Sequence, residues 1–400
     1  MSLTLLLDLD DTLLNTNLDA FIPAYFQALG QHLSSRVAPE TLLSALIGGM
    51  SRMNDSEDPT RTLEEIFSEQ FYPDLGLQKE ELQETFEEFY DHVFPALSAH
   101  TTLREEAAAF IEWVLSCGYR VAIATDPFFP RKATLERIRW AGLDPDALEL
   151  ISTFEHFHFS KTHPAYYAEV LGRLGWPEGP VLMVGNDVER DLIPAHRLGL
   201  ATYLIDGDSA SGPGFEAGRG TLAELRPWLE SINLSTLEPS FHSRDAILGI
   251  LNSTPAVLHS LTAALTGEQW KHEPAYENWA VNEIACHLRD TERDIHMMQL
   301  HLLLEREGAF IPRPDTGIWA NERQYLHVDG PTALAQFASA RMEMIRILKE
   351  QPDEMWTRKA RHAIFGPTNF REVIGFVADH DRLHVQQAWK TLQHINWVAR

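Results

Sequence analysis

The stretch LLLDLDDTLL, Leu5–Leu14, places three aspartates, Asp8, Asp10 and Asp11, inside an otherwise aliphatic run. A buried strand tolerates ionised carboxylates only where something compensates their charge, because taking each one out of water costs several kcal/mol. Side chains alternate along a strand, so Asp8 and Asp10 project to the same side at its carboxyl end, where open parallel sheets build their sites. Magnesium, a hard ion that prefers oxygen ligands, suits two carboxylates at this edge.

The runs around this stretch predict a parallel sheet. Short segments rich in leucine or β-branched residues predict strands at Leu3–Leu9, Tyr119–Thr125, Leu148–Thr153, Val181–Gly185 and Ala201–Ile205. From Tyr119 on, these segments alternate with helical ones, the pattern of a sheet covered on both faces. The expected fold class is therefore α/β, a Rossmann-like parallel sheet. Residues 206–220, rich in glycine and serine, predict an exposed loop.

A long insert separates the first two predicted strands. Residues 15–100 show helical periodicity and carry 15 acidic against four basic side chains. This segment is too long for a connection and predicts a helical subdomain. Within it, Gly48 and Gly49 of LIGGMSRMND predict a hinge or substrate loop, with a plain helix-to-helix turn as the alternative.

The strand pattern ends before residue 240, and an all-α bundle is expected beyond it. Helices are predicted at Asp245–Leu265, Val281–Arg306, Thr332–Gln351 and Phe370–Gln393, the last with a capping box of Asn369 and Glu372. The expected domains are a core at 1–14 and 101–230, a cap at 15–100, a linker at 231–241 and a four-helix bundle at 242–400.

Charge and composition exclude several classes of function. Of the formal charge of −25 over 400 residues, residues 1–239 hold −22 and residues 240–400 only −3. So acidic a protein repels nucleic acid. The two cysteines, Cys117 and Cys286, form no CxxC motif, and the chain shows no signal peptide and no membrane-length apolar run. A cytoplasmic protein without nucleic-acid or membrane partners is expected.

Four motifs give the first part of the chain a family resemblance. DLDDT, VAIATD, HFSKTHPAYY and MVGNDVERD occur in order at the ends of successive predicted strands. They resemble the motifs of haloacid dehalogenase-like (HAD) hydrolases over residues 1 to about 230. The positions that match are Asp8, Asp10, Thr125, Lys161, Asp187 and Asp191. In that family a helical insert at this place is a cap that closes over the site and selects the substrate.

The resemblance implies a catalytic role for each of four residues. Asp8 would attack phosphorus and form an aspartyl-phosphate, and Asp10 would act as general acid and base. Thr125 would donate a hydrogen bond to the phosphoryl group, and Lys161 would offset its charge. An acid at position 10 favours phosphoryl transfer over dehalogenation, because a departing halide needs no proton.

The resemblance also implies a magnesium site. Asp8, the Asp10 carbonyl, Asp187 and Asp191 would hold Mg²⁺. The family most often places Asp directly after the glycine of the last motif, where this chain has Asn186. Which of residues 186, 187 and 191 contacts the metal therefore stays open, and a degraded, non-catalytic HAD domain is the alternative.

Histidines in the predicted bundle share a face with apolar residues. In the last helix His380 and His384 lie on a stripe with Val373, Val377 and Ala388. The stripe of the second helix comprises Ile284, His287, Thr291, Ile295, Met298 and Leu302. Three inward imidazoles would be satisfied by one shared metal ion. Neighbouring carboxylates such as Glu283 or Asp379 are the alternative partners, and His296 and His301 are expected at the surface.

ENWAVNEIACHLRDTERD and ADHDRLHVQQAW resemble the DinB-like (YfiT-like) four-helix-bundle family over about residues 242–398. The resemblance implies that His287, His380 and His384 form its metal triad. Zn²⁺, Ni²⁺ and Fe²⁺ all suit imidazole ligands. Relatives include thiol-dependent transferases.

The function expected from the sequence is a Mg²⁺-dependent phosphatase that acts on a small phosphorylated metabolite and is fused to a metal-binding bundle. A phosphate ester is the expected ligand, and an exposed bundle face could support a homodimer. The alternatives are a metal-dependent thiol transferase, or a binding or sensing module in which neither site turns over.

Overall fold

The computed structural model of the chain describes residues 2–206, 213–274 and 279–395. The chain forms two compact units, Met1–Tyr167 with Glu178–Pro239, and Ala168–Pro177 with Ser240–Arg400. Across the described residues, no helix combines the length and apolar character needed to cross a membrane.

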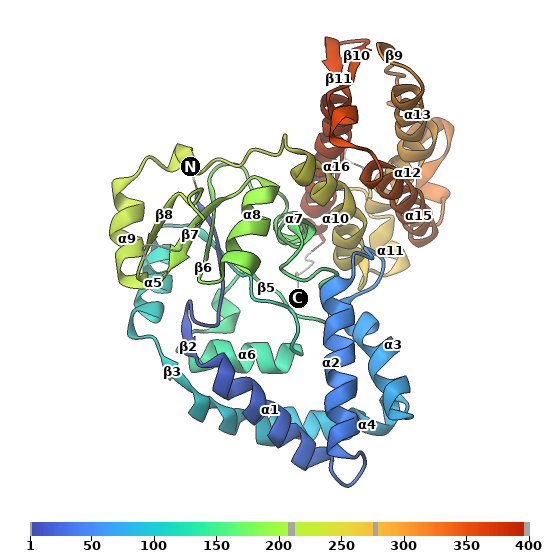
Figure 1. Cartoon of the computed structure of the whole chain (residues 1–400). Helices are drawn as coiled ribbons and strands as arrows, with labels where there is room; N and C mark the ends of the chain where they lie inside the picture. Colours follow the sequence, from blue (N-terminus) through green and yellow to red (C-terminus); the bar gives the residue numbers. More distant parts are fainter. Residues whose placement is uncertain (1, 207–212, 275–278, 396–400) are drawn as a thin grey trace. The chain divides into compact units, whose positions relative to one another are not determined.

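A six-stranded parallel sheet is the centre of the first unit (Figure 1), which confirms the predicted fold class. Its order is β5-β4-β1-β6-β7-β8. The strands are β1 (Thr4–Leu7), β4 (Arg120–Ile123), β5 (Leu150–Ile151), β6 (Val181–Gly185), β7 (Ala201–Ile205) and β8 (Gly218–Gly220). Because β1 pairs with β4 on one side and β6 on the other, its carboxyl end lies in the middle of the sheet edge.

Helices bury both faces of this sheet. Leu5 belongs to a core that also contains side chains of α5 (Glu105–Ser116) and α9 (Leu222–Ser231), and Leu6 on the opposite face is fully buried. The same core includes Leu237, so the predicted linker contributes to packing. Further helices and turns are η3 (Pro145–Ala147), α6 (Arg131–Trp140), α7 (Pro164–Arg173), the π-helical turn η4 (Val188–Leu192), α8 (Ile193–Leu198) and η5 (Leu234–Leu237).

Strand β8 corrects the prediction of a loop over residues 206–220, of which 207–212 lie outside the described residues. It pairs in parallel with β7, with Gly218 opposite Tyr203. A Cβ at Gly218 would lie 2.6 Å from the Trp228 ring, and Gly220 has a φ of +154°. Glycine is therefore required here by close packing and backbone conformation, although it is depleted in strands generally.

The insert is helical, as expected. It contains α1 (Leu18–Leu33), α2 (Pro39–Asp55), α3 (Leu63–Leu75), α4 (Lys79–Glu88), the π-helical turn η1 (Phe89–Val93) and the 3₁₀ helix η2 (Phe94–His100). These segments share an aromatic core that includes Phe21, Phe71 and Phe94. Its two ends pair as an antiparallel stem of β2 (Leu14–Thr16) and β3 (Thr101–Leu103), which the sequence did not predict.

Gly48 and Gly49 lie inside α2, so the predicted hinge or turn at this place is wrong. A Cβ at Gly49 would lie only 2.5 Å from the Phe67 ring of α3. A Cβ at Gly48 would be 3.6 Å from Asp74, an ordinary contact. Gly49 thus lets two helices approach closely, which explains its place in a helix interior.

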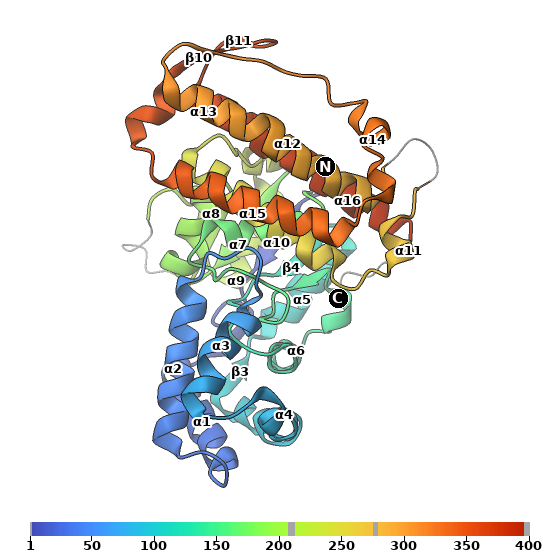
Figure 2. The ribbon, with the colours of Figure 1, turned by 90° about the vertical axis from the view of Figure 1, so that its right-hand side faces the viewer.

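Four long helices form the bundle of the second unit, as predicted (Figure 2). They are α10 (Arg244–Thr262), α12 (Val281–Thr291), α15 (Gly330–Lys349) and α16 (Phe370–Gln393). Both α10 and α12 pack against α15 and α16. The predicted second helix is divided by a π-helical turn, η6 (Glu292–His296), before α13 (Met297–Glu305). Shorter helical segments are α11 (Gly267–Trp270), α14 (Trp319–Glu322), η7 (Tyr325–His327) and η8 (Asp353–Thr357).

The prediction that strands are absent beyond residue 240 is wrong. A small sheet joins β9 (Ala309–Ile311), β10 (Lys359–His362) and β11 (Gly366–Asn369). Strands this short carry too few alternating residues to give a periodic pattern. The predicted capping box is half formed: Asn369 accepts the amide of Glu372 at 3.0 Å, but the Glu372 carboxylate accepts the Thr368 hydroxyl instead.

Alanine substitutions at the two neighbouring glycines should have opposite effects. Gly49→Ala should destabilise the first unit by about 1–3 kcal/mol, because the new methyl group overlaps Phe67. Gly48→Ala should be neutral or stabilise by up to ~1 kcal/mol through helix propensity. Urea unfolding of the two variants measures the difference, and equal midpoints would contradict this packing.

Candidate active site and metal centre

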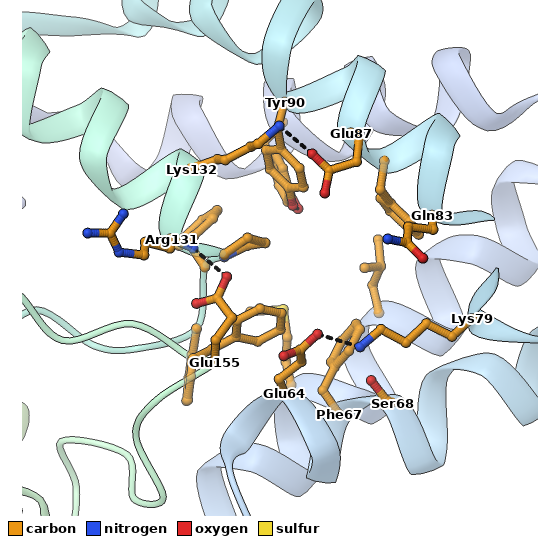
Figure 3. A pocket seen from close by; sticks show the side chains of 18 of the residues that line it. Glu64, Phe67, Ser68, Lys79, Gln83, Glu87, Tyr90, Arg131, Lys132 and Glu155 are labelled. Atoms are coloured by element: carbon orange, nitrogen blue, oxygen red, sulfur yellow. Dashed lines mark hydrogen bonds and ion pairs between the residues drawn. The ribbon is translucent and has the colours of Figure 1, made fainter. Parts of the chain in front are cut away.

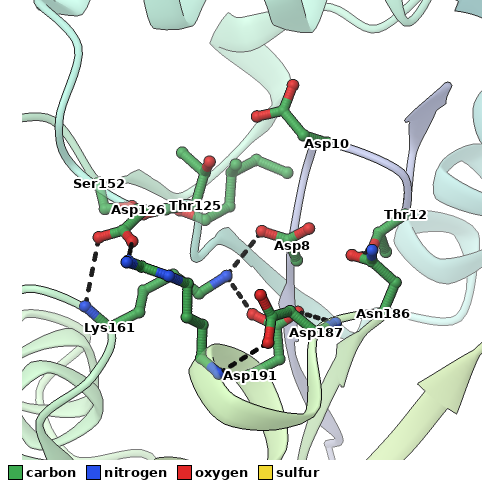
Figure 4. Close-up of polar contacts among 12 residues, drawn as sticks. Asp8, Asp10, Thr12, Thr125, Asp126, Ser152, Lys161, Asn186, Asp187 and Asp191 are labelled. Atoms are coloured by element: carbon green, nitrogen blue, oxygen red, sulfur yellow. Dashed lines mark hydrogen bonds and ion pairs between the residues drawn. The ribbon is translucent and has the colours of Figure 1, made fainter. Parts of the chain in front are cut away.

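One buried lysine lies between two buried carboxylates at the carboxyl edge of the sheet (Figure 4). Lys161 Nζ donates to Asp8 Oδ1 at 2.6 Å and also pairs with Asp191. Burial raises the pKa of the Asp8 carboxyl despite this contact, and burial with the Asp8 charge raises the pKa of Asp191. Although burial opposes it, the charges of Asp191 and Asp8 raise the pKa of Lys161 well above its usual value. The cluster holds more negative than positive charge, which favours a further cation.

The residues of the last motif have different environments. Asp191 is buried, and its Oδ2 accepts the Asp187 amide at 3.0 Å. Asp187 is exposed, and its Oδ1 caps η4 by accepting the amides of Glu189 and Arg190 at 2.9 and 3.1 Å. Asn186 Oδ1 accepts the Thr12 hydroxyl at 3.3 Å. Buried carboxylate oxygens with uncompensated charge fit a hard divalent ion such as Mg²⁺, and Asp8 with Asp191 supplies them.

Asp10 is held by two partners that the sequence did not reveal. Its Oδ1 accepts the Thr16 hydroxyl at 2.8 Å, and its Oδ2 accepts from Arg137 of α6 at 2.6 Å. Arg137 is only 2% exposed. Its position four residues after the buried Ala133, on the core face of α6, is the signal that could have identified it. The third aspartate, Asp11, has a structural role.

Asp11 stabilises the turn that starts the insert. Its φ is +58°, a left-handed conformation that is rare for residues other than glycine, and its Oδ1 accepts the Thr16 amide at 2.8 Å. Arg104, after β3, donates to the Asp11 carbonyl and to Asn15, both at 3.1 Å. The turn and stem are thereby fixed directly beside Asp10.

The loop after β4 completes this edge. Thr125 is buried, and its carbonyl accepts the Ser152 and Tyr166 hydroxyls at 2.6 and 2.9 Å. Asp126, a residue not singled out in the sequence, accepts the Lys161 amide at 3.3 Å and pairs with Arg190. The structure thus brings Asp8, Lys161 and Asp191 into contact, with the other predicted residues at the same edge (Figure 4).

In the second unit, the three predicted histidines lie together. The Nε2 atoms of His287 on α12 and His380 on α16 are 3.2 Å apart, and one ring nitrogen of each histidine, His384 included, lies within 4.8 Å of the other two. Burial, with the nearby imidazoles, lowers the pKa of His287 to about 2 and that of His384 to about 3. Neutral imidazole is the form that binds metal, so this donor set fits a divalent transition metal.

The alternative partners of these histidines have other contacts. Glu283 accepts the Ala280 amide at 3.0 Å, and Asp379 pairs with Arg382 at 3.3 Å. His384 instead contacts Gln387, with Nδ1 2.9 Å from its side-chain oxygen.

His296, expected at the surface, is buried at 8% exposure. Its Nδ1 lies 3.0 Å from Glu292, and its ring centroid is 5.1 Å from that of His380. The π-helical turn η6 causes this difference, because the wider turn changes which face the following residues occupy. Met298, predicted to face inward, is accordingly 38% exposed, whereas His301 is exposed as expected.

A fully buried arginine underlies the histidine cluster. Arg341 of α15 donates to Glu292 at 2.6 and 2.8 Å, and it also pairs with Asp381. Burial opposes the ionised form, but Arg341 holds the pKa of Asp381 well below its usual value. Glu292 contacts His296, and Asp381 Oδ1 lies 3.8 Å from His380 Nδ1. These charges come from three helical segments, so no single-helix pattern could have revealed the network.

Comparison with known proteins identifies both parts of the chain. Residues 3–199 match the family model of haloacid dehalogenase-like hydrolases, and residues 250–388 match that of the DinB superfamily. The two matches, one over each part of the chain, confirm both resemblances.

Solved structures also align with each part of the chain. The HAD phosphatase from Thermococcus onnurineus is 24% identical, with 57% of this chain and 98% of that one covered and a TM-score of 0.38. The 2-haloacid dehalogenase from Pseudomonas syringae pv. tomato is 19% identical, with 57% and 99% covered and a TM-score of 0.43. YfiT from Bacillus subtilis, a four-helix bundle of unusual topology, is 20% identical, with 40% and 90% covered and a TM-score of 0.35. No curated protein matches the chain.

The buried arginine should be essential for the stability of the bundle. Arg341→Met leaves Glu292 and Asp381 buried without their counter-ion, which should cost about 3–5 kcal/mol. Arg346→Met, an exposed change on the same helix, should leave the unfolding midpoint close to that of the wild-type chain. Chemical unfolding monitored by circular dichroism measures both, and equal effects would show that the network carries little of the stability.

Proposed function

We propose that the first unit is a phosphatase for small phosphate monoesters that works through a covalent intermediate on Asp8. The observation that carries this proposal is the Asp8–Lys161–Asp191 cluster in the middle of the sheet edge. The carboxylate is poised as a nucleophile, and the ammonium can bind an incoming phosphate oxygen. The family match to hydrolases supports the same reaction class.

Each step can be assigned to a residue of this chain. An Asp8 oxygen forms a bond to phosphorus while the bond from phosphorus to the alcohol oxygen breaks, and Asp10 gives its proton to that oxygen. Asp10 then takes a proton from the water that attacks the aspartyl-phosphate, which releases phosphate and restores Asp8. Thr125 donates to the phosphoryl oxygens, and Lys161 compensates their charge. Thr16 and Arg137 keep the Asp10 carboxyl in place.

A magnesium ion belongs to this proposal. Asp8, the Asp10 carbonyl and Asp191 would hold it, with Asp187 or Asn186 as a further contact. When bound, Mg²⁺ would supply positive charge beside the phosphoryl oxygens. The helical insert would act as the cap that covers the site during turnover.

For the second unit we propose a divalent transition-metal site at His287, His380 and His384. The support is their mutual approach within 4.8 Å and the lowered pKa values of His287 and His384, which keep these imidazoles neutral. Three protein ligands leave room for a thiol or water, as a metal-dependent thiol transferase would need.

Replacement of the nucleophile should abolish turnover. Asp8→Asn should remove Mg²⁺-dependent hydrolysis of p-nitrophenyl phosphate, because an amide oxygen is too weak a nucleophile to form the intermediate. Asp10→Asn should lower kcat by roughly 10²–10⁴-fold, since only proton transfer is lost. Asp19→Asn, an exposed control in α1, should keep wild-type kinetics. Hydrolysis that survives in Asp8→Asn would rule out the aspartyl-phosphate route.

Metal content tests the histidine cluster. After dialysis against trace Zn²⁺, Ni²⁺ or Fe²⁺, the wild-type chain should retain about one equivalent per chain, since three imidazoles converge on one site. His384→Ala should lose most of it, whereas His301→Ala, exposed on α13, should retain it. Elemental analysis gives the answer, and unchanged metal in His384→Ala would remove the triad from consideration.

A further inference from the structure

An aromatic pocket of about 300 Å³ lies between the insert helices and the loops that leave the sheet (Figure 3). Its lining comes from α1 to α4, from η1, from the start of α6 and from the loops after β4 and β5. The aromatic side chains are Tyr25, Phe26, Phe67, Tyr72, Phe86, Tyr90, Phe128, Phe129 and Phe154. A pocket of this size with so many aromatic side chains suits a bulky apolar or aromatic group and not a short, fully polar one.

Most charged groups around the pocket are already paired. Glu64 accepts from Lys79 at 2.6 Å, and Glu87 pairs with Lys132. Glu155 differs from them. Its Oε1 accepts the Arg131 amide at 2.7 Å, and the Thr153 hydroxyl is a second donor to the carboxylate, but no lysine or arginine side chain pairs with it within the described part of the chain.

Glu155 therefore points to a ligand. Figure 3 shows Glu155 among the side chains that line the pocket, with one carboxylate oxygen bonded to the Arg131 amide. A carboxylate that lines an apolar pocket without a counter-ion is costly, and a bound cation would offset that cost. A cationic ligand with N–H groups would pair with this carboxylate and compensate its charge.

The pocket borders the proposed catalytic edge. Phe128 and Phe129 follow Thr125 by three and four residues, so the chain places Phe128 within about 11 Å of Thr125. Arg137 lies over the Phe129 ring at 4.5 Å and holds Asp10 at 2.6 Å. One wall of the pocket is thus one side chain away from the proposed acid. The alcohol part of a phosphate ester on Asp8 could extend into this space.

We propose that the aromatic pocket binds the alcohol part of the substrate, and that this part is an aromatic or similarly bulky group that carries a protonated amine. The proposal rests on the phosphatase function proposed above. Ring faces attract organic cations, and Glu155 pairs with the ammonium group. A second phosphate would instead meet the Glu155 carboxylate, so bisphosphates are disfavoured.

Two substrates that differ in one group test this specificity. We would compare kcat/KM for 4-(aminomethyl)benzyl phosphate and 4-methylbenzyl phosphate, whose leaving alcohols have similar reactivity, with ethyl phosphate as the small reference. The full-length chain with Mg²⁺ should favour the amine over its methyl analogue by at least tenfold, and both over ethyl phosphate. Glu155→Gln keeps an acceptor for the Arg131 amide but loses the charge, and it should reduce the amine preference to about threefold or less.

The control is Glu84→Gln, an exposed change on α4 outside the pocket, which should keep the full preference. If hydrolysis depends on Asp8 but the two benzyl phosphates react equally, or if Glu155→Gln keeps the tenfold preference, the pocket assignment is wrong and the phosphatase stands. If neither benzyl phosphate nor p-nitrophenyl phosphate is hydrolysed with any dependence on Asp8, the phosphatase proposal itself fails, and this inference fails with it.

Discussion

The buried ammonium of Lys161 is the interaction on which the sheet edge depends. Asp8 comes from the end of β1 and Asp191 from η4, and their charges repel each other in a region closed to water. Lys161 contacts both, so three segments far apart in the sequence meet at one point. Gly185 makes the approach possible, because a Cβ there would lie 2.2 Å from the Asp191 carboxylate. The same contacts of Lys161 thus stabilise the local fold and position the residues of the proposed site.

The bundle contains a similar arrangement, in which one buried cation contacts two buried carboxylates. Arg341 has no exposed surface and compensates two buried carboxylates, Glu292 and Asp381. Each carboxylate lies next to a histidine, so the network can fix imidazole orientation without adding net positive charge near a cation. The first unit presents a negative site for a hard ion, and the second presents neutral nitrogen donors for a softer one. The two sites are therefore expected to select different metals.

Local patterns predicted five of the six strands of the parallel sheet, because each signal lies within a few consecutive positions. The failures lie where tertiary contacts decide. Position 218 is glycine within a strand because the Trp228 ring occupies the space that a Cβ would need. Position 49 is glycine within a helix because the Phe67 ring does the same. His296 faces inward because η6 adds a wide turn that a 3.6-residue period cannot anticipate.

The partners of the site residues were the least predictable feature. Arg137 reaches Asp10 from a helix 127 positions later in the chain, and only the fold brings them together. Glu155 likewise appears as one more acidic residue in a strongly acidic unit. Its significance arises only from the rings around it and from the lack of a basic partner among the described residues. A sequence can indicate a nucleophile, but it cannot show which carboxylate lacks a counter-ion.

The charges of the first unit also restrict how a substrate can be oriented. Phosphate is attracted to the Lys161 ammonium at the sheet edge, whereas Glu155 lies among aromatic rings on the insert side. A molecule with a phosphate at one end and an ammonium at the other gains at both positions in one orientation. Reversed, it would place phosphate against Glu155 and an ammonium against Lys161, two repulsive contacts with little water to screen them. The Glu155 carboxylate, which disfavours a polyanionic ligand, would thus orient a dipolar one.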